Sequence, residues 1–123
     1  MTRSRASAKA AGTRFETSIA DALADHVDDR IERRRQSGAK DRPDLAAVRT
    51  RDGARVVVET KDYGGRFLIG PWLNEVATER DNDGAEVGVV VAKRRGVTDP
   101  LKQVVVMEVA DLVALLREGG RQA

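Results

Sequence analysis

The chain has 123 residues and a formal net charge of +2 at pH 7, a length that supports one domain without a second independent core. It contains no cysteine, which excludes a disulfide framework and thiolate metal sites, so that any bound metal must be a hard cation held by oxygens. Because the chain has neither an apolar run of membrane-spanning length nor a signal-like start, we expect a soluble cytoplasmic protein without a membrane partner.

The positive charges are gathered in three clusters, although the chain as a whole is nearly balanced. They are Arg3, Arg5, Lys9 and Arg14, then Arg30, Arg33, Arg34, Arg35, Lys40 and Arg42, and finally Lys93, Arg94 and Arg95. Clusters of this kind indicate a polyanion partner. For any single cluster, a solvated surface is an equally good interpretation.

The N-terminal end differs in composition from the rest. Residues 1–10 lack large apolar side chains and are predicted to form a flexible basic arm. One domain is then expected over residues 11–118, followed by a short tail over residues 119–123.

An amphipathic helix is predicted over residues 12–26, because apolar side chains recur every four positions from Phe15 to Val27. The arginine-rich segment 30–35 follows it. This segment either extends the helix or forms a basic edge strand, and its periodicity does not decide between the two.

A β-hairpin is predicted next. Two short β-prone runs, 45–48 and 55–58, flank the turn signal around Gly53. Antiparallel pairing of these runs brings Asp44, at the start of the first, close to Glu59, at the end of the second. Lys61 is two positions beyond Glu59 and therefore points to the same face of the strand.

The C-terminal half contains two more helices and two more strands. A helix begins with Pro71 at its first position and ends at Gly84, and the unbroken apolar run 87–92 predicts a strand covered on both faces. Another strand over 104–107 precedes a last helix with Asp111 near its start. The order α-β-β-β-α-β-β-α predicts an α/β fold with a mixed sheet between helices.

Asp44, Glu59 and Lys61 form the strongest candidate site. Two carboxylates beside an ammonium group can hold Mg²⁺ and direct a water molecule at a phosphodiester. The alternative is a pair of solvated strand-end acids with Lys61 as their ion-pair partner. The apolar strand before Glu59 favours the first interpretation, because half-buried carboxylates repel each other unless a cation or a proton joins them.

Three motifs resemble those of the PD-(D/E)XK nuclease superfamily: Pro43-Asp44, Glu59-x-Lys61, and a helix with a glutamate near its start, Gly12-x-x-x-Glu16. The resemblance covers roughly residues 12–110 and implies a restriction-endonuclease-like fold. The short length, this helix and the loop over residues 37–40 are most similar to archaeal-type Holliday-junction resolvases and their phage-encoded relatives.

The resemblance also implies roles for individual residues. Asp44, Glu59 and the main-chain carbonyl of Thr60 would hold Mg²⁺, with Mn²⁺ able to substitute. Lys61 would orient the attacking water and stabilise charge on the phosphate, and Glu16 would assist from the helix. For Glu16 the alternative is an acid favoured in a first helical turn by the helix dipole alone.

The chain departs from the superfamily in two places. The strand that normally precedes the aspartate is represented only by the arginine-rich segment 30–35. The helix after Lys61 offers Glu75 and Glu79 where many relatives carry glutamine or lysine, and we interpret both glutamates as surface charges.

The sequence therefore predicts a Mg²⁺-dependent endonuclease, most similar to a junction resolvase that cuts four-way DNA as a homodimer, since two symmetric cuts need two sites. Expected DNA contacts are Arg33, Arg34, Arg35, Lys40, Arg42, Lys93, Arg94 and Arg95. The alternatives are a nuclease of this fold with another DNA task, such as restriction, exonucleolytic trimming or phage DNA processing, and a non-catalytic DNA-binding module.

Overall fold

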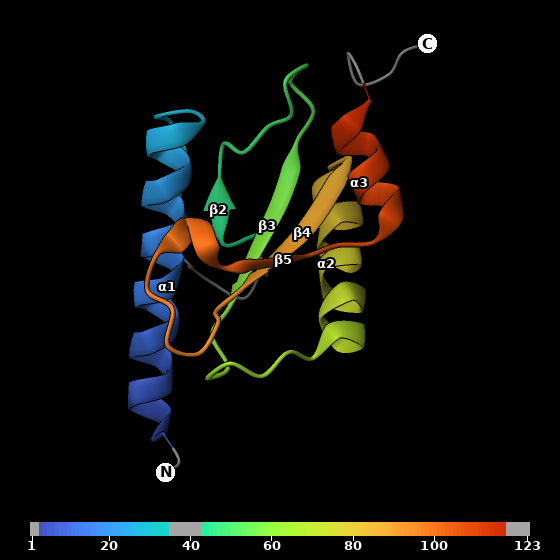
Figure 1. Ribbon diagram of the computed structural model, residues 1–123. Coiled ribbons are helices and arrows are strands. Elements are labelled where there is room, and N and C mark those ends of the chain that lie inside the picture. Colours follow the sequence, from blue (N-terminus) through green and yellow to red (C-terminus); the bar gives the residue numbers. More distant parts are fainter. Residues whose placement is uncertain (1–2, 35–42, 118–123) are drawn as a thin grey trace.

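The computed structural model describes residues 3–34 and 43–117 (Figure 1). The helices are α1 (Arg5–His26), α2 (Ile69–Asp83), α3 (Val109–Leu116) and the short 3-10 helix η1 (Pro100–Lys102). The strands are β1 (Glu32–Arg33), β2 (Leu45–Ala46), β3 (Val56–Lys61), β4 (Val87–Ala92) and β5 (Val104–Val106). Apart from η1, this is the predicted order of helices and strands, and the α/β class is confirmed.

The centre of the fold is a three-stranded mixed sheet in the order β3-β4-β5. β3 and β4 are parallel, whereas β5 runs antiparallel to β4. The register places Glu59 beside Val90 and Lys61 beside Ala92. β1 and β2 form a separate antiparallel pair.

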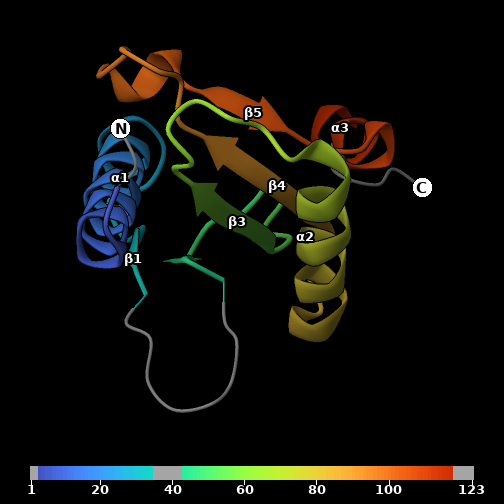
Figure 2. The same cartoon turned by 90° about the horizontal axis from the view of Figure 1, so that it is seen from below.

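Helices cover both faces of the central sheet, with α1 on one side and α2 on the other (Figure 2). Alternate residues of β3 enter different parts of the core: Val58 packs in the cluster that contains Phe15 of α1, and Val57 packs with Trp72 of α2. All six residues of β4 are buried, as the unbroken apolar run predicted. Among the described residues, no helix has the length and apolarity needed to cross a membrane.

Helix α1 begins at Arg5, seven residues earlier than predicted, so the expectation of a flexible arm is wrong for residues 5–10. The reason is local. Ser4 caps the helix by accepting a hydrogen bond from the Ser7 N–H (3.0 Å), and four alanines between positions 6 and 11 have the highest helix propensity. Glu16 therefore lies in the middle of α1 and not in its first turn.

The predicted hairpin forms only around its turn. The Val56 N–H donates to the Val48 carbonyl (3.0 Å), but β2 pairs with β1 and not with β3. Ala47 explains the difference, because its φ of 69° lies in the left-handed region and breaks the run 45–48 after Ala46. The pairing also settles part of segment 30–35: Glu32–Arg33 is an edge strand and not an extension of α1.

Helix α2 starts two residues before Pro71 and ends, as predicted, at Gly84, which adopts the left-handed conformation (φ 67°). It lies close to the sheet at Gly88, where a Cβ atom would approach the Val76 carbonyl oxygen to 3.2 Å. The buried Asp111 of α3 accepts a hydrogen bond from the Gly88 N–H (3.0 Å) and pairs with Arg80 of α2 (3.3 Å). The loop over residues 37–40 and the tail over 119–123 lie outside the described residues.

Candidate active site

The structure brings Asp44 and Glu59 together at the edge of β3. The Asp44 N–H donates to Glu59 Oε2 (3.3 Å). Its side chain in turn accepts hydrogen bonds at Oδ2 from the Thr60 N–H (2.7 Å) and the Thr60 hydroxyl (3.1 Å). The Asp44 carboxylate thus binds the main-chain donor that a further strand would otherwise use, and the two hydrogen bonds from Thr60 hold this carboxylate in place.

Lys61 lies on the same face of β3 as Glu59, as the spacing of two predicted. Its Nζ donates to Glu75 Oε1 on α2 (2.8 Å), and only 14% of its side chain is exposed. Burial lowers the pKa of Lys61, but the hydrogen bond and charge of Glu75 outweigh this effect and leave the pKa raised. Lys61 is therefore an ammonium group at neutral pH.

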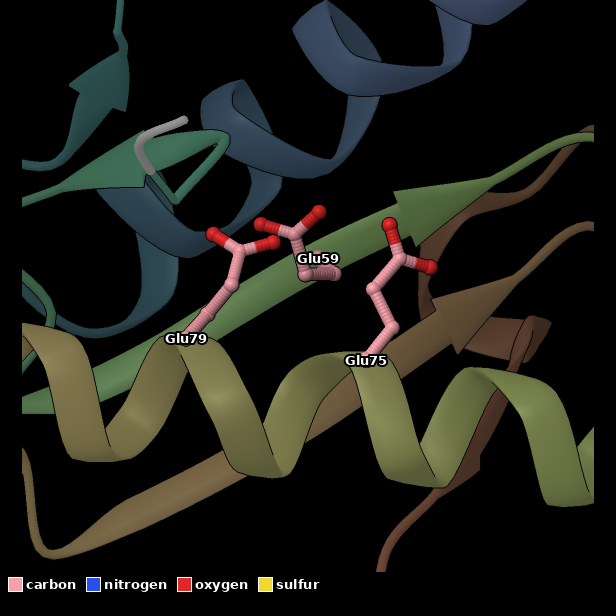
Figure 3. Close-up of side chains that lie close together, drawn as sticks. All are labelled: Glu59, Glu75 and Glu79. Carbon is pink, nitrogen blue, oxygen red and sulfur yellow. The ribbon is translucent and has the colours of Figure 1, made fainter. Parts of the chain in front are cut away.

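Glu59 also faces two glutamates of α2. Carboxylate oxygens of Glu59, Glu75 and Glu79 all lie within 4.8 Å of one another, and Figure 3 shows the α2 side chains extending from successive turns toward Glu59. Glu75 is exposed and Glu79 is partly buried. The interpretation of Glu79 as a surface charge is therefore wrong, whereas Glu75 is an exposed residue, as predicted, that also belongs to the cluster around Glu59.

One signal for this cluster was present in the sequence. Glu75 and Glu79 are four residues apart, so they share a helix face, and two like charges at that spacing destabilise an isolated helix. Val76 lies between them in the sequence and is buried, so this side of the helix faces the sheet. A glutamate pair on either side of a buried valine indicates acids at the border of the helix face that packs on the sheet.

Burial changes the acidity of the paired carboxylates. Glu59 is only 5% exposed, and desolvation raises its pKa well above the usual range, with further increases from the charges of Asp44 and Glu79. Burial also raises the pKa of Asp44 to about 6, although the Thr60 hydrogen bonds act in the opposite direction. At neutral pH the pair must be joined by a proton or a cation.

Glu16 of α1 is a further acid near Asp44. Burial is the main cause of the raised pKa of Asp44, and the negative charge of Glu16 adds to it. The Glu16 carboxylate pairs with Arg33 Nε of β1 at 2.7 Å. Because Glu16 is mid-helix, the explanation from the helix dipole is wrong, and Arg33 is a neutralising partner that the sequence did not identify.

The donors of this cluster suit a hard divalent cation. Within the described chain, Glu59, Glu75 and Glu79 are the group of three acids close enough to share one ion. Asp44 adds a carboxylate beside Glu59, although it is not one of these three. The excess negative charge and the raised pKa values are relieved when a cation replaces the shared proton. The residues present therefore fit Mg²⁺, while a ligand role for the Thr60 carbonyl stays a prediction.

The predicted DNA-binding residues lie in separate places. Arg33 is engaged by Glu16, and the main chain of Arg34 donates to the Asp44 carbonyl (2.8 Å), so the basic strand lies directly against the acidic site. Lys93, Arg94 and Arg95 follow β4 at the end of the sheet where Lys61 ends β3. Arg35, Lys40 and Arg42 lie outside the described residues.

Comparison with protein-family models, with curated proteins and with solved structures finds no match to this chain. The functional argument therefore depends on the geometry of the site itself.

Proposed function

We propose that the protein is a Mg²⁺-dependent DNA endonuclease of the PD-(D/E)XK type with a restriction-endonuclease-like fold. The observation that carries this proposal is the position of Glu59. A carboxylate that is 5% exposed receives a hydrogen bond from Asp44, faces Glu79 and lies two positions from a cationic lysine. A purely structural role does not explain why a buried carboxyl group is placed beside two further acids.

The chain's residues divide the work of phosphodiester hydrolysis. Asp44, Glu59 and Glu79 would hold the metal. When bound, Mg²⁺ supplies a Lewis acid for the phosphate and lowers the pKa of water. Thr60 contributes by holding Asp44 Oδ2 with two hydrogen bonds, so the carboxylate does not have to reorganise when the substrate enters.

Lys61 acts as a cation in this proposal and not as a general base. Its raised pKa and its contact with Glu75 keep the proton on Nζ at neutral pH. A protonated lysine can donate hydrogen bonds that orient a water molecule, and its charge stabilises the negative charge that develops on the phosphate. The proton released by the attacking water must therefore go to solvent or to a carboxylate of the cluster.

The decisive experiment is a cleavage assay with the full-length protein. We would incubate it with Mg²⁺ or Mn²⁺ and four-way, forked, linear duplex and single-stranded DNA. Glu59→Gln and Asp44→Asn should lower cleavage at least about 1000-fold while DNA binding persists, because each removes a ligand that acts in the transition state. Asp25→Asn, at an exposed acid of α1, is the matched control and should cleave normally.

Two results would overturn the nuclease proposal. One is a folded wild-type protein that cuts none of these DNAs with either metal. The other is a Glu59→Gln variant with wild-type turnover, which would mean that the buried carboxylate has no part in the reaction.

Within this proposal, a junction resolvase acting as a homodimer is the more specific form. β5 is the outer strand of the central sheet, and α3, which follows it in the chain, exposes apolar side chains, with Val109 74% and Leu116 73% exposed. A second copy of the chain that pairs with the edge of β5 and covers α3 would extend the sheet and bury these apolar side chains.

The dimer and its selectivity can be tested together. Light scattering should show a dimer for the wild type and a monomer for Val109→Glu. The wild type should also place paired nicks in opposed strands of a four-way junction and cut linear duplex poorly. A fully active monomer, or equal cutting of junction and duplex, would leave a nuclease with another DNA task.

A further inference from the structure

A second site lies at the carboxyl ends of β3 and β4, apart from the acidic cluster. There the turn after β3 meets the turn after β4, and a cavity of about 270 Å³ opens between them. Figure 1 shows both turns at the same end of the sheet. The Lys93 N–H donates to the Lys61 carbonyl (2.9 Å), so this cavity begins next to the residue that ends β3. Carboxyl ends of parallel strands are a common place for ligands in open α/β sheets.

The lining of the cavity is strongly cationic. It contains four basic side chains, Arg3, Lys93, Arg94 and Arg95, and one acid, Asp62. Asp62 is paired with Arg3 at 2.8 Å. Within residues 3–34 and 43–117, no carboxylate forms an ion pair with the other three bases.

Main-chain carbonyls hold these bases in place, and of the three only Lys93 also interacts with the charge of Asp62. Lys93 Nζ donates to the Arg94 carbonyl (2.9 Å), and Arg95 Nε donates to the Gly64 carbonyl (3.2 Å). Arg94 Nη1 donates to the Lys102 carbonyl (3.2 Å). Three positive charges are thus oriented around one cavity, which is the arrangement that a multiply charged anion requires.

The backbone of the cavity depends on a close approach at Gly65. This residue has a φ of 95°, and a Cβ atom there would lie 2.8 Å from Arg95 Cβ. Gly64 also has a positive φ of 66°. Only glycine permits this pair of conformations together with the contact to Arg95, so the sequence Gly64-Gly65 is what lets the two turns meet.

We propose that this cavity binds a phosphate group of a nucleic-acid strand. The planar guanidinium group of arginine matches the geometry of phosphate oxygens. Three bases that form no ion pair also carry more positive charge than a ligand with a single carboxylate would balance. The assignment of the phosphate to DNA rests on the proposed function, whereas the affinity for phosphate does not. The phosphate has two sources, an internal phosphodiester or the phosphomonoester at a strand end, which carries a charge of about −1.5 to −2.

The first test uses inorganic phosphate and the isotope-labelled full-length protein in EDTA. Phosphate should shift the amide signals of Gly64, Gly65 and Gly96, with half-saturation in the roughly millimolar range. Sodium chloride at the same ionic strength is the control for screening. Shifts that chloride reproduces, or that map elsewhere, would overturn the proposal.

The second test identifies the source of the phosphate. Single-stranded oligonucleotides of one sequence, with and without a 5′- or 3′-phosphate, would be bound in EDTA so that no cleavage is possible. Tighter binding of one phosphorylated end assigns the cavity to a strand terminus, and equal binding assigns it to an internal phosphate. In either case Arg95→Gln should weaken binding about tenfold, because it removes a charged donor.

Matched variants keep this second test decisive. Arg51→Gln removes the same charge from the turn at the opposite end of β3 and should change binding less than about twofold. Lys93→Gln provides a second variant if Arg95→Gln does not fold, and circular dichroism would check each protein. Binding that resists both pocket variants would overturn the inference. Since every measurement excludes divalent metal, its outcome is independent of whether the protein cuts DNA.

Discussion

β3 and β4 are neighbouring strands of equal length, but β3 carries residues of the candidate active site and β4 carries only residues of the core. Each has six residues, they pair in parallel, and α1 and α2 cover them from the two sides. On the face toward α2, β4 presents Val90 and Ala92 where β3 presents Glu59 and Lys61. The comparison shows that Glu59 lies in an environment where the neighbouring strand has apolar side chains. The loss of solvent there is the main reason why the pKa of Glu59 is raised so far.

Their places in the sheet explain how one strand can carry charges. β4 pairs with β3 along its whole length and with β5 along Val90–Ala92, so this part of β4 has a partner strand on each side. Nearer its start, the Gly88 N–H is bound by the Asp111 carboxylate instead of a strand. β3 has only β4 as a ladder partner, and at its other edge the Thr60 N–H is bound by the side chain of Asp44. The open edge of β3 therefore admits a second carboxylate beside Glu59, whereas the neighbouring Val90 of β4 has strand partners on both sides.

Among the variants that test this comparison of β3 with β4, the largest effect should come from removing the charge at the end of β3. Lys61→Ala should slow cleavage about 10²–10³-fold, the loss typical of one preorganised donor to a developing charge. Single-turnover rates would measure it, and Lys102→Ala, which removes an exposed lysine of η1, is the control. If Lys61→Ala cut DNA at the wild-type rate, Lys61 would be no more than an ion-pair partner of Glu75.

A change on β4 should act on stability instead. Val90→Ala creates a cavity at a fully buried position and should lower the free energy of unfolding by about 2–3 kcal/mol in urea titrations. The cleavage rate of the folded fraction should stay near wild type. Val105→Ala on β5, where half of the side chain is exposed, is the control and should cost less than about 0.5 kcal/mol. Equal losses of unfolding free energy in Val90→Ala and Val105→Ala would contradict the contrast between the interior strand β4 and the edge strand β5.

The carboxylates of the site should make the metal-free protein sensitive to pH. The folded pKa values of Asp44 and Glu59 are raised, so their contribution to stability is complete below about pH 4 and is lost as pH rises through about 6 for Asp44 and further for Glu59. In EDTA at pH 7.5, Glu59→Gln should therefore melt roughly 4 °C higher than wild type, with a smaller difference at pH 4.5. A lower melting temperature of Glu59→Gln at pH 7.5 would show that burying the Glu59 carboxyl group does not lower the stability at that pH.

The smallest effect concerns the ion pair between Lys61 and Glu75. Glu75 raises the pKa of Lys61, so Glu75→Gln should move the alkaline limb of the pH–rate profile to lower pH. At pH 7 the rate should fall about fivefold at most, because Glu75 is 48% exposed. A loss as large as that of Lys61→Ala would instead indicate a direct role for Glu75 in holding the metal.

Features with a strong local pattern could be predicted from the sequence. The apolar run of β4, the Gly84 end of α2 and the meeting of Asp44 with Glu59 all follow from the residues at those positions. The two carboxylates meet even though the intervening chain is not a continuous hairpin, because the turn around Gly53 is sufficient to return the chain.

Features that depend on distant partners could not be predicted. The left-handed conformation of Ala47 has no signal in its residue type, and it decides that β2 pairs with β1. The place of Glu79 in the site depends on how α2 lies across β3, and Glu16 acquires its partner only when β1 packs on α1. The early start of α1, by contrast, could have been predicted from Ser4, a good N-cap residue, and from the alanines that follow it.

The close contact between Gly88 and α2 makes substitutions at position 88 harmful to the candidate site. Any side chain at position 88 meets the backbone of Val76, which lies between the two glutamates of α2 that face Glu59. A larger residue would displace the helix and carry both carboxylates away from β3. In a random-mutagenesis screen for loss of activity, position 88 should therefore appear together with the acidic residues, although it has no functional group of its own.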